Sequence, residues 1–204
     1  MSGDSVRVAQ PLFPVEGQGS IPMSPLQFEI VQIETKLAKQ LNKLWHSRLP
    51  LIYSFDSKIC YGLEYKNILF AVSVWSHPVS RYFSVDTHME LRRMAISPEA
   101  PKNTASRFIK LMIINIKKKF INVHTLLSYQ DTEVHTGTIY KASGWKKKAI
   151  STKPNWKTKW PYTQRNEYQS TAPKIRWEKQ IRSEPEPEAI IKPPKKIPQK
   201  GLFF

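Results

Sequence analysis

An apolar pattern with the length of a helix lies between two apolar patterns with the length of strands, and this succession restricts the possible folds. A strand is expected over His88–Ile96, an amphipathic helix over Ala105–Phe120 and a buried strand over Val123–Ser128. The apolar residues of the helix recur at three- and four-residue spacing: Phe108, Ile109, Met112, Ile113 and Ile116. A strand–helix–strand succession of this kind is typical of a mixed α/β domain.

Further elements are expected on the N-terminal side. A stripe of apolar residues predicts a helix over Leu26–Trp45, and Pro50 stops any continuation. The stripe consists of Ile30, Ile33, Leu37, Leu41 and Leu44. Two strands follow, Lys58–Tyr65 and Ile68–Trp75, with a tight turn at Lys66–Asn67.

On the C-terminal side, a short helix is expected over His135–Ser143, because Gly144 is a natural helix terminator. Closing strands are expected near Trp145–Ser151 and Lys174–Ile181. The predicted fold class is therefore α/β, mixed and α+β-like. It is a single domain with a central mixed sheet flanked by helices, followed by a basic C-terminal tail.

The two ends of the chain differ from this domain. Residues 1–25 contain four prolines and three glycines, which predicts an extended N-terminal arm. The domain is expected over residues 26–150, with closing strands up to about residue 182. Residues 183–204 are rich in proline and lysine and are expected to be a disordered tail.

The charge indicates an anionic partner. The formal net charge is +16, and from Trp145 onward 15 Lys and Arg stand against 5 Glu. Such a field favours phosphate polymers or an anionic membrane surface. The longest apolar run, residues 108–116, is far too short to span a membrane, so nucleic acid is favoured. The single cysteine, Cys60, cannot form an internal disulfide, which fits a reducing compartment.

Two segments could carry chemistry. At Lys102–Arg107 a polar loop enters a helix, and the first-turn N–H groups there could bind a phosphate or simply be capped. At Thr138–Trp145 a helix bearing Tyr140 ends at glycine followed by an aromatic residue. No hydrolase, Walker or zinc-protease motif is present. The five scattered histidines could serve a metal site or be structural residues.

The second segment resembles the closing motif of the GNAT superfamily of N-acetyltransferases. The chain also resembles the bacteriophage Mom family, an offshoot of that superfamily, over roughly residues 26–150. The resemblance rests on short motifs in order: Trp45–Pro50, Pro78–Arg81, Glu90–Met94, Pro101–Arg107, Ser128–Asp131 and His135–Tyr140. It implies a GNAT-like fold and a phage-encoded enzyme of the host cytoplasm, which adds a carbamoylmethyl-type group to N6 of DNA adenine and protects the DNA from restriction.

The resemblance also implies partners and a donor. The DNA would be double-stranded with the target base flipped, or single-stranded. The usual glycine-rich pyrophosphate loop of the superfamily is absent, and Pro101–Arg107 stands in its place. The donor is therefore acetyl-CoA or another acyl or aminoacyl donor, and a metal requirement is left open.

The resemblance assigns roles to three groups of residues. The donor would be held by Asn103, Thr104, Ser106 and Arg107. The catalytic residues would be Tyr140, Asp131, Glu90 and Arg93. The substrate side would be lined by His46, Ser47, Arg48, Ser80, Arg81 and Tyr129.

Each assignment has a structural alternative. Tyr140 could simply pack on the sheet, and Asp131 could cap the following helix. Glu90 and Arg93 are expected to form an ion pair, which could position the site or be purely structural. Two other functions stay open: a non-catalytic DNA-binding protein, and an N-acetyltransferase acting on a protein or a small amine.

Overall fold

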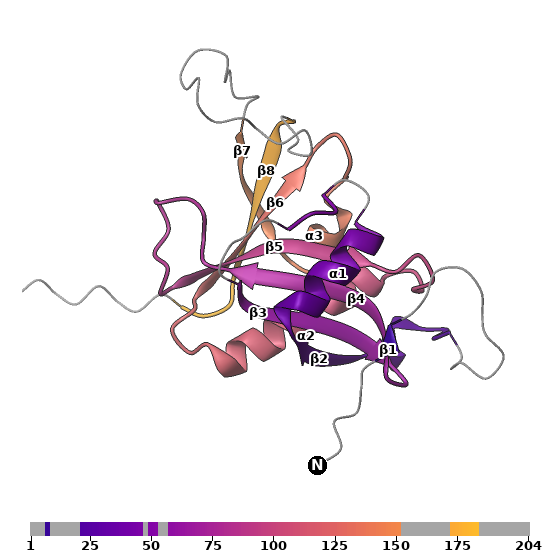
Figure 1. The fold of residues 1–204 in the computed structure, drawn as a ribbon. Helices are drawn as coiled ribbons and strands as arrows, with labels where there is room; N and C mark the ends of the chain where they lie inside the picture. The colour runs from indigo at the N-terminus through magenta and orange to yellow at the C-terminus, as the bar shows by residue number, and fades with distance from the viewer. Residues whose placement is uncertain (1–6, 9–20, 47–48, 53–56, 152–171, 184–204) are drawn as a thin grey trace, which may run out of the picture.

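The computed structural model describes residues 7–8, 21–46, 49–52, 57–151 and 172–183 (Figure 1). A 3-10 turn, Pro25–Gln27, precedes the first long strand. The strands are β1 (Arg7–Val8), β2 (Glu29–Ile33), β3 (Ser57–Tyr65), β4 (Ile68–Ser76), β5 (His88–Ile96), β6 (Thr125–Asp131), β7 (Lys146–Ser151) and β8 (Lys174–Gln180). The helices are α1 (Thr35–Trp45), α2 (Thr104–Lys119) and α3 (Thr138–Ala142).

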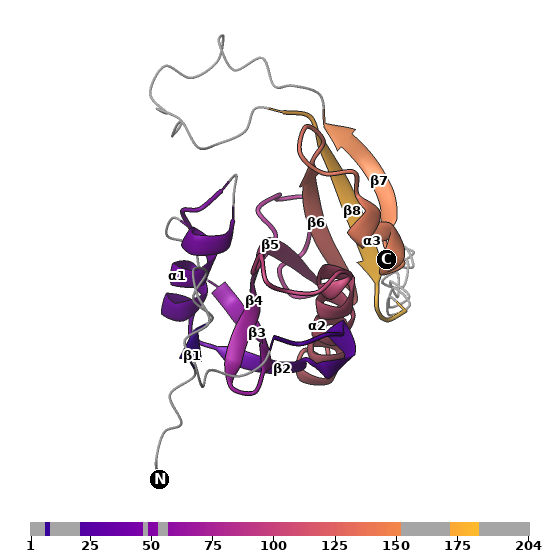
Figure 2. The same ribbon diagram turned by 90° about the vertical axis from the view of Figure 1, so that its right-hand side faces the viewer.

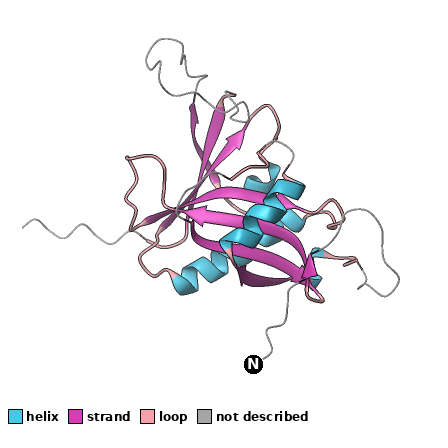
Figure 3. Ribbon diagram, in the orientation of Figure 1, coloured by secondary structure: helices cyan, strands magenta, loops and turns pink. Residues whose placement is uncertain are grey.

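All these strands belong to one sheet, in the order β2-β3-β4-β5-β6-β8-β7 (Figure 3). Neighbours along this path are antiparallel, except that β5 and β6 are parallel. The short β1 lies parallel to β4. Because parallel neighbours need a crossover, α2 connects β5 to β6, as the strand–helix–strand pattern predicts. The mixed α/β fold predicted from the sequence is confirmed.

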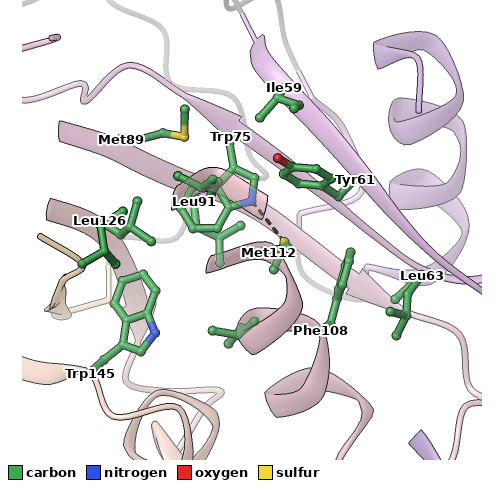
Figure 4. Packing of buried hydrophobic residues seen from close by; sticks show 14 of the residues in the cluster. Ile59, Tyr61, Leu63, Trp75, Met89, Leu91, Phe108, Met112, Leu126 and Trp145 are labelled. Atoms are coloured by element: carbon green, nitrogen blue, oxygen red, sulfur yellow. Dashed lines mark hydrogen bonds between the residues drawn. The ribbon is translucent and has the colours of Figure 1, made fainter. Parts of the chain in front are cut away.

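The helices cover opposite faces of this sheet (Figure 2). Leu41 of α1 packs with Leu69, Val72 and Ala95 on one face. On the other face, α2 buries its apolar stripe in the main core, where Trp75 Nε1 donates to Met112 Sδ at 3.1 Å (Figure 4). Several large core side chains are fully buried, so this face supplies most of the hydrophobic stabilisation.

The predicted helix Leu26–Trp45 is wrong in its first half. Residues Glu29–Ile33 form β2, an edge strand paired with β3, and α1 begins only at Thr35. The sequence EIVQI is rich in β-branched residues, which favour a strand once an edge is available. The apolar spacing there fits both periods, and tertiary pairing decides between them.

The other elements lie close to their predicted places. The turn at Lys66–Asn67 has positive φ at both residues, 50° and 62°, as a two-residue hairpin loop of this kind requires. The predicted helix His135–Ser143 is shorter than expected, because α3 begins at Thr138 after Gly137 in the left-handed conformation. Gly144 ends it with φ 71°, as predicted.

The sheet forks between its two parallel strands. β5 and β6 pair only from His88–Thr125 to Leu91–Ser128. Beyond that point β5 stays with β4, while β6 continues beside β8. The pairing of β5 with β4 skips Arg92, which forms a β-bulge. In a regular strand, residues three positions apart point to opposite faces, but the bulge lets Leu91 and Met94 both contact the main core. This fork and its β-bulge position the candidate site.

Most of the predicted arm, residues 1–25, and nearly all of the predicted tail, residues 183–204, lie outside the described residues. Of the arm, Arg7–Val8 forms β1 and Pro22 is buried. Within the described ranges, no helix has the length and apolar character needed to cross a bilayer.

Candidate active site

A cavity of about 720 Å³ lies at the fork of the sheet. Its walls come from both faces. Trp45, His46 and Leu49 belong to the α1 side, whereas Ala105, Ile139 and Tyr140 belong to the side of α2 and α3. A small molecule could therefore approach from one face while its reaction partner enters from the other.

Tyr140 lies in the wall of this cavity, at the point where the strands part. Its side chain is only 8% exposed, and its hydroxyl lies 2.9 Å from Ser128 Oγ. Ser128 donates its own proton to Leu91 O at 3.4 Å, so Tyr140 is the donor to Ser128. Burial raises the pKa of Tyr140, an effect that the hydrogen bond to Ser128 partly opposes. The phenol is therefore protonated at neutral pH and can act as an acid.

The ring of Tyr140 is held by two tryptophans that sequence reasoning did not place in the site. Trp177 of β8 stacks on it with centroids 5.3 Å apart, and Trp145 meets it edge-on at 5.6 Å. Trp177 Nε1 in turn donates to Gln130 Oε1 at 2.7 Å. Trp177 is 37 residues away along the chain, so only the pairing of β8 with β6 brings it here.

The predicted ion pair of Glu90 and Arg93 is wrong, because Arg92 is the partner of Glu90. Arg92 Nη1 lies 3.0 Å from Glu90 Oε1, and Val79 N–H donates to Oε2 at 3.0 Å. Arg92 is the residue that the β-bulge adds, and the bulge leaves it close to the carboxylate. Glu90, only 4% exposed, thus ties the loop after β4 to the floor of the site.

Arg93 lines the same cavity with a different set of contacts. Its Nη1 donates to Arg92 O at 2.7 Å, and its Nε has no hydrogen-bond partner within the described part of the chain. Burial, together with the neighbouring charge of Arg92, lowers the pKa of Arg93 to about 10, although Glu90 opposes the shift. Arg93 remains cationic at neutral pH and gives this wall positive charge.

His46 closes the α1 side of the cavity. Burial, with the charges of Arg93 and His135, lowers its pKa to about 4. Leu49 N–H donates to His46 Nδ1 at 3.1 Å, so the neutral ring carries its proton on Nε2. The buried amide of Asn42 anchors the segment that follows, donating to Leu49 O at 2.9 Å and Pro50 O at 3.0 Å. Sequence reasoning missed Asn42, whose place on the helix gives no signal of this contact.

The remaining predicted substrate and catalytic residues divide into three groups. Ser80, Tyr129 and Asp131 line the cavity, and burial, with the charge of Glu90, raises the pKa of Tyr129. Asp131 Oδ1 accepts from Glu133 N–H at 3.0 Å, within the turn that follows β6. The capping alternative is wrong, because the N-cap of α3 is Gly137 and no side chain caps the helix there. Arg81 is exposed beside the cavity and does not line it. The predicted pair Ser47 and Arg48 lies outside the described residues.

The four residues predicted to hold the donor lie around the start of α2, and none of them lines the cavity. Ala105 is the residue of this turn that does line it. Thr104 Oγ1 donates to Pro101 O at 2.6 Å, and Ser106 Oγ donates to Asn103 O at 3.0 Å. Asn103 is exposed in the left-handed conformation, with φ 68°. The hydroxyls of this turn thus serve the loop, and donor binding by these four residues stays a prediction.

No group of three or more histidine, cysteine, aspartate or glutamate side chains that could hold a metal occurs within the described ranges. His46 and His135 are near each other at the cavity, but they lack a third such ligand there.

The fold of this chain is similar to that of several solved N-acetyltransferases. One similar structure is the ribosomal-protein-S18-alanine N-acetyltransferase from Escherichia coli, with TM-score 0.55 and 14% identity over 78% of this chain and 97% of that one. Another is a GNAT family acetyltransferase from Elizabethkingia anophelis with acetyl-CoA bound, with TM-score 0.54 and 17% identity over 76% and 98%. The chain therefore has the GNAT acetyltransferase fold.

The particular family follows from the sequence. The Mom protein family matches residues 27–188, which is most of the chain, so the protein belongs to the Mom family. This match confirms the resemblance and extends it through β7 and β8, beyond the residues on which it was first based. No curated protein sequence matches the chain significantly.

Proposed function

We propose that this protein is a transferase that adds a small acyl-derived group of the carbamoylmethyl type to N6 of adenine in DNA. The observation that carries the proposal is the protonated hydroxyl of Tyr140 in the wall of a cavity that side chains from both faces of the sheet line. Membership of the Mom family and the formal net charge of +16 support DNA as the substrate. Phage DNA in the cytoplasm of a bacterial host, shielded from restriction, is the proposed setting.

The chemistry requires two proton movements. N6 of adenine bonds to the transferred carbon, the bond from that carbon to the donor breaks, and N6 loses one proton. In the proposal the Tyr140 O–H turns from Ser128 to supply its proton to the departing atom of the donor, and Ser128 holds the phenol in place before the reaction. Asp131, in the wall of the same cavity, receives the proton that the amine loses. Glu90 and Arg92 do not take part in proton transfer in this proposal. They position the site, because their ion pair and the bond from Val79 N–H to Glu90 hold the loop after β4 against β5.

The proposed donor is acetyl-CoA or another acyl or aminoacyl donor, which would supply the electrophilic carbon. Acetyl-CoA could deliver only an acetyl group, with the CoA thiol as the leaving group, whereas the amide nitrogen of a carbamoylmethyl group requires an aminoacyl donor. Acetyl-CoA is bound in one of the similar GNAT structures. The first turn of α2 suits an anionic part of the donor, because the N–H groups of Ala105 and Ser106 have no acceptor among the described residues. Ala105 also lines the cavity, so such a donor would reach from this turn to Tyr140.

The substrate would enter from the α1 side. Adenine in a duplex keeps its N6 in the major groove, so a base that reaches Tyr140 must be flipped or single-stranded. Arg93 and neutral His46 line this entrance, where the positive charge of Arg93 suits the backbone of a flipped nucleotide.

Nucleoside mass spectrometry of host DNA tests this function. Bacteria that express the full chain are expected to contain a heavier deoxyadenosine, and the mass increase identifies the added group. Cells that express Tyr140→Phe at the same level are expected to lack it. An unchanged nucleoside profile, together with an acetylated protein or small amine, would instead support the N-acetyltransferase alternative.

A further inference from the structure

The loop between β4 and β5, residues 77–87, projects beyond the sheet on the left of Figure 1. Two of its residues, Val79 and Ser80, form part of the cavity wall. The loop is therefore one rim of the entrance through which the substrate would reach Tyr140. The residues at the tip of this loop have no role in the proposed transfer reaction.

The loop is fixed at its base from several sides. Val79 N–H is held by buried Glu90, and Lys58 Nζ donates to Val85 O at 3.2 Å. Phe83 packs on His88 with ring centroids 5.1 Å apart, while the Arg176 guanidinium lies 4.9 Å from the centre of the Phe83 ring. Contacts of this kind hold the rim in a defined place.

The tip of the same loop carries an aromatic side chain with almost no cover. Tyr82 is 97% exposed, and Val79 on the cavity side is 67% exposed. The backbone of the tip is ordered, because Phe83 N–H donates to Ser80 O at 3.3 Å and Tyr82 N–H lies 3.4 Å from Ser80 Oγ. An exposed aromatic ring on a fixed turn is accessible to a partner that can stack on it.

We propose that Tyr82 is a wedge, which inserts into the base stack of duplex DNA and fills the gap left by the base that enters the cavity. This inference rests on the proposed function, since it needs a DNA substrate. Unstacking a base costs a few kcal/mol, and a ring that stacks in the gap offsets part of this cost. Arg81, exposed next to Tyr82, places a cation where the phosphates flanking the gap would lie.

Fluorescence anisotropy with the full-length protein tests the wedge without needing the donor or the target sequence. The probes are a labelled intact duplex and the same duplex with one abasic site, which already contains the gap. The wild type is expected to bind the abasic duplex about tenfold more tightly than the intact one, because stacking of one ring has that magnitude. Tyr82→Ala should lose this preference and Tyr82→Phe should keep it.

Ile121→Ala serves as the matched control, because Ile121 is also a large exposed apolar residue but lies in the turn after α2, away from the cavity. This variant should keep the preference. If the wild type shows no preference, or Tyr82→Ala retains it, the wedge is wrong.

Nucleoside mass spectrometry of DNA from cells expressing the wild type separates the two proposals. A preference that depends on Tyr82 while no adenine is modified would refute the transferase and leave the wedge standing. Adenine modification with equal binding of both duplexes would refute the wedge alone.

Discussion

Tyr140 is the residue on which the proposed chemistry depends most. Its ring is packed between Trp145 and Trp177, while its hydroxyl contacts only Ser128 among the hydrogen bonds of the described residues. Removing the oxygen should therefore leave the fold intact and remove the acid. We expect Tyr140→Phe to lower the rate of transfer at least about 100-fold, with little change in Tm.

The control for this prediction is Ser128→Ala, which keeps the phenol and removes the hydroxyl that holds it. Rates measured by nucleoside mass spectrometry over time should fall less in this variant than in Tyr140→Phe. Equal rates in wild type and Tyr140→Phe would exclude Tyr140 as the acid.

His46 makes the stability depend on pH. Its pKa falls from 6.5 to about 4 on folding, so below pH 6.5 the unfolded chain binds a proton that the folded chain does not. The contribution of neutral His46 is thus fully present above pH 6.5 and is lost as the pH falls toward 4. We expect the free energy of unfolding of the wild type to fall more steeply over this window than that of His46→Gln. Urea denaturation at several pH values measures both, and parallel curves would contradict the assignment.

At the scale of elements, two glycines determine how α3 fits against the sheet. Gly137 has φ 77°, and a Cβ there would lie 2.6 Å from Gln130 Oε1 and 2.7 Å from the Trp177 ring. Gly144 has φ 71°, but its Cβ would meet only the flexible end of Lys179. We expect Gly137→Ala to lower the free energy of unfolding by at least about 2 kcal/mol. Gly144→Ala should cost about 1 kcal/mol.

Chemical denaturation of the two variants side by side checks this order. Because Gly137 also positions the residues that hold Tyr140, its variant should lose transfer activity as well as stability. Equal stability losses would mean that the two side chains around Gly137 adjust to the added methyl group.

The elements that sequence predicts best are those that local patterns define. The hairpin of β3 and β4, the strand β5 and the helix α2 follow from alternation, a tight turn and one apolar stripe. The strand β2 was missed because its apolar residues fit a helical period as well, and only pairing with β3 decides. Local signals cannot show pairing between distant segments.

The candidate site follows the same rule. The motif at Thr138–Trp145 predicted Tyr140 in the site, but Ser128 and Trp177 reach it through strand pairing that no local pattern indicates. The partner of Glu90 was predicted as Arg93 on the assumption of a regular strand. The β-bulge at Arg92 changes which arginine reaches the carboxylate, and nothing in the sequence announces a bulge there.

At the scale of the whole molecule, the excess of positive charge determines how the protein meets its proposed substrate. With a formal net charge of +16, binding to DNA should release condensed counterions and weaken steeply with salt. We expect the affinity for an intact duplex to fall by at least about tenfold between 50 and 200 mM salt. Anisotropy titrations across this range measure the slope. A flat salt dependence would argue against DNA as the partner.

In the proposed function, the donor and the base would meet at Tyr140, where side chains from both faces of the forked sheet line one cavity. The fold would position the two reactants, and the positive charge would attract the DNA. The family match covers the strands on both sides of the fork, which agrees with one continuous functional unit.

Transfer to adenine N6 is tested most directly by the mass of an oligonucleotide after incubation with the purified full-length protein and a bacterial extract as donor source. We expect a heavier deoxyadenosine with the wild type and none with Tyr140→Phe, and the next substrate separates N6 from other positions. We also expect no gain when every adenine is replaced by 2-aminopurine, which lacks the N6 amine. A mass gain on the 2-aminopurine oligonucleotide, or equal gains with wild type and Tyr140→Phe, would contradict transfer to N6 at this site.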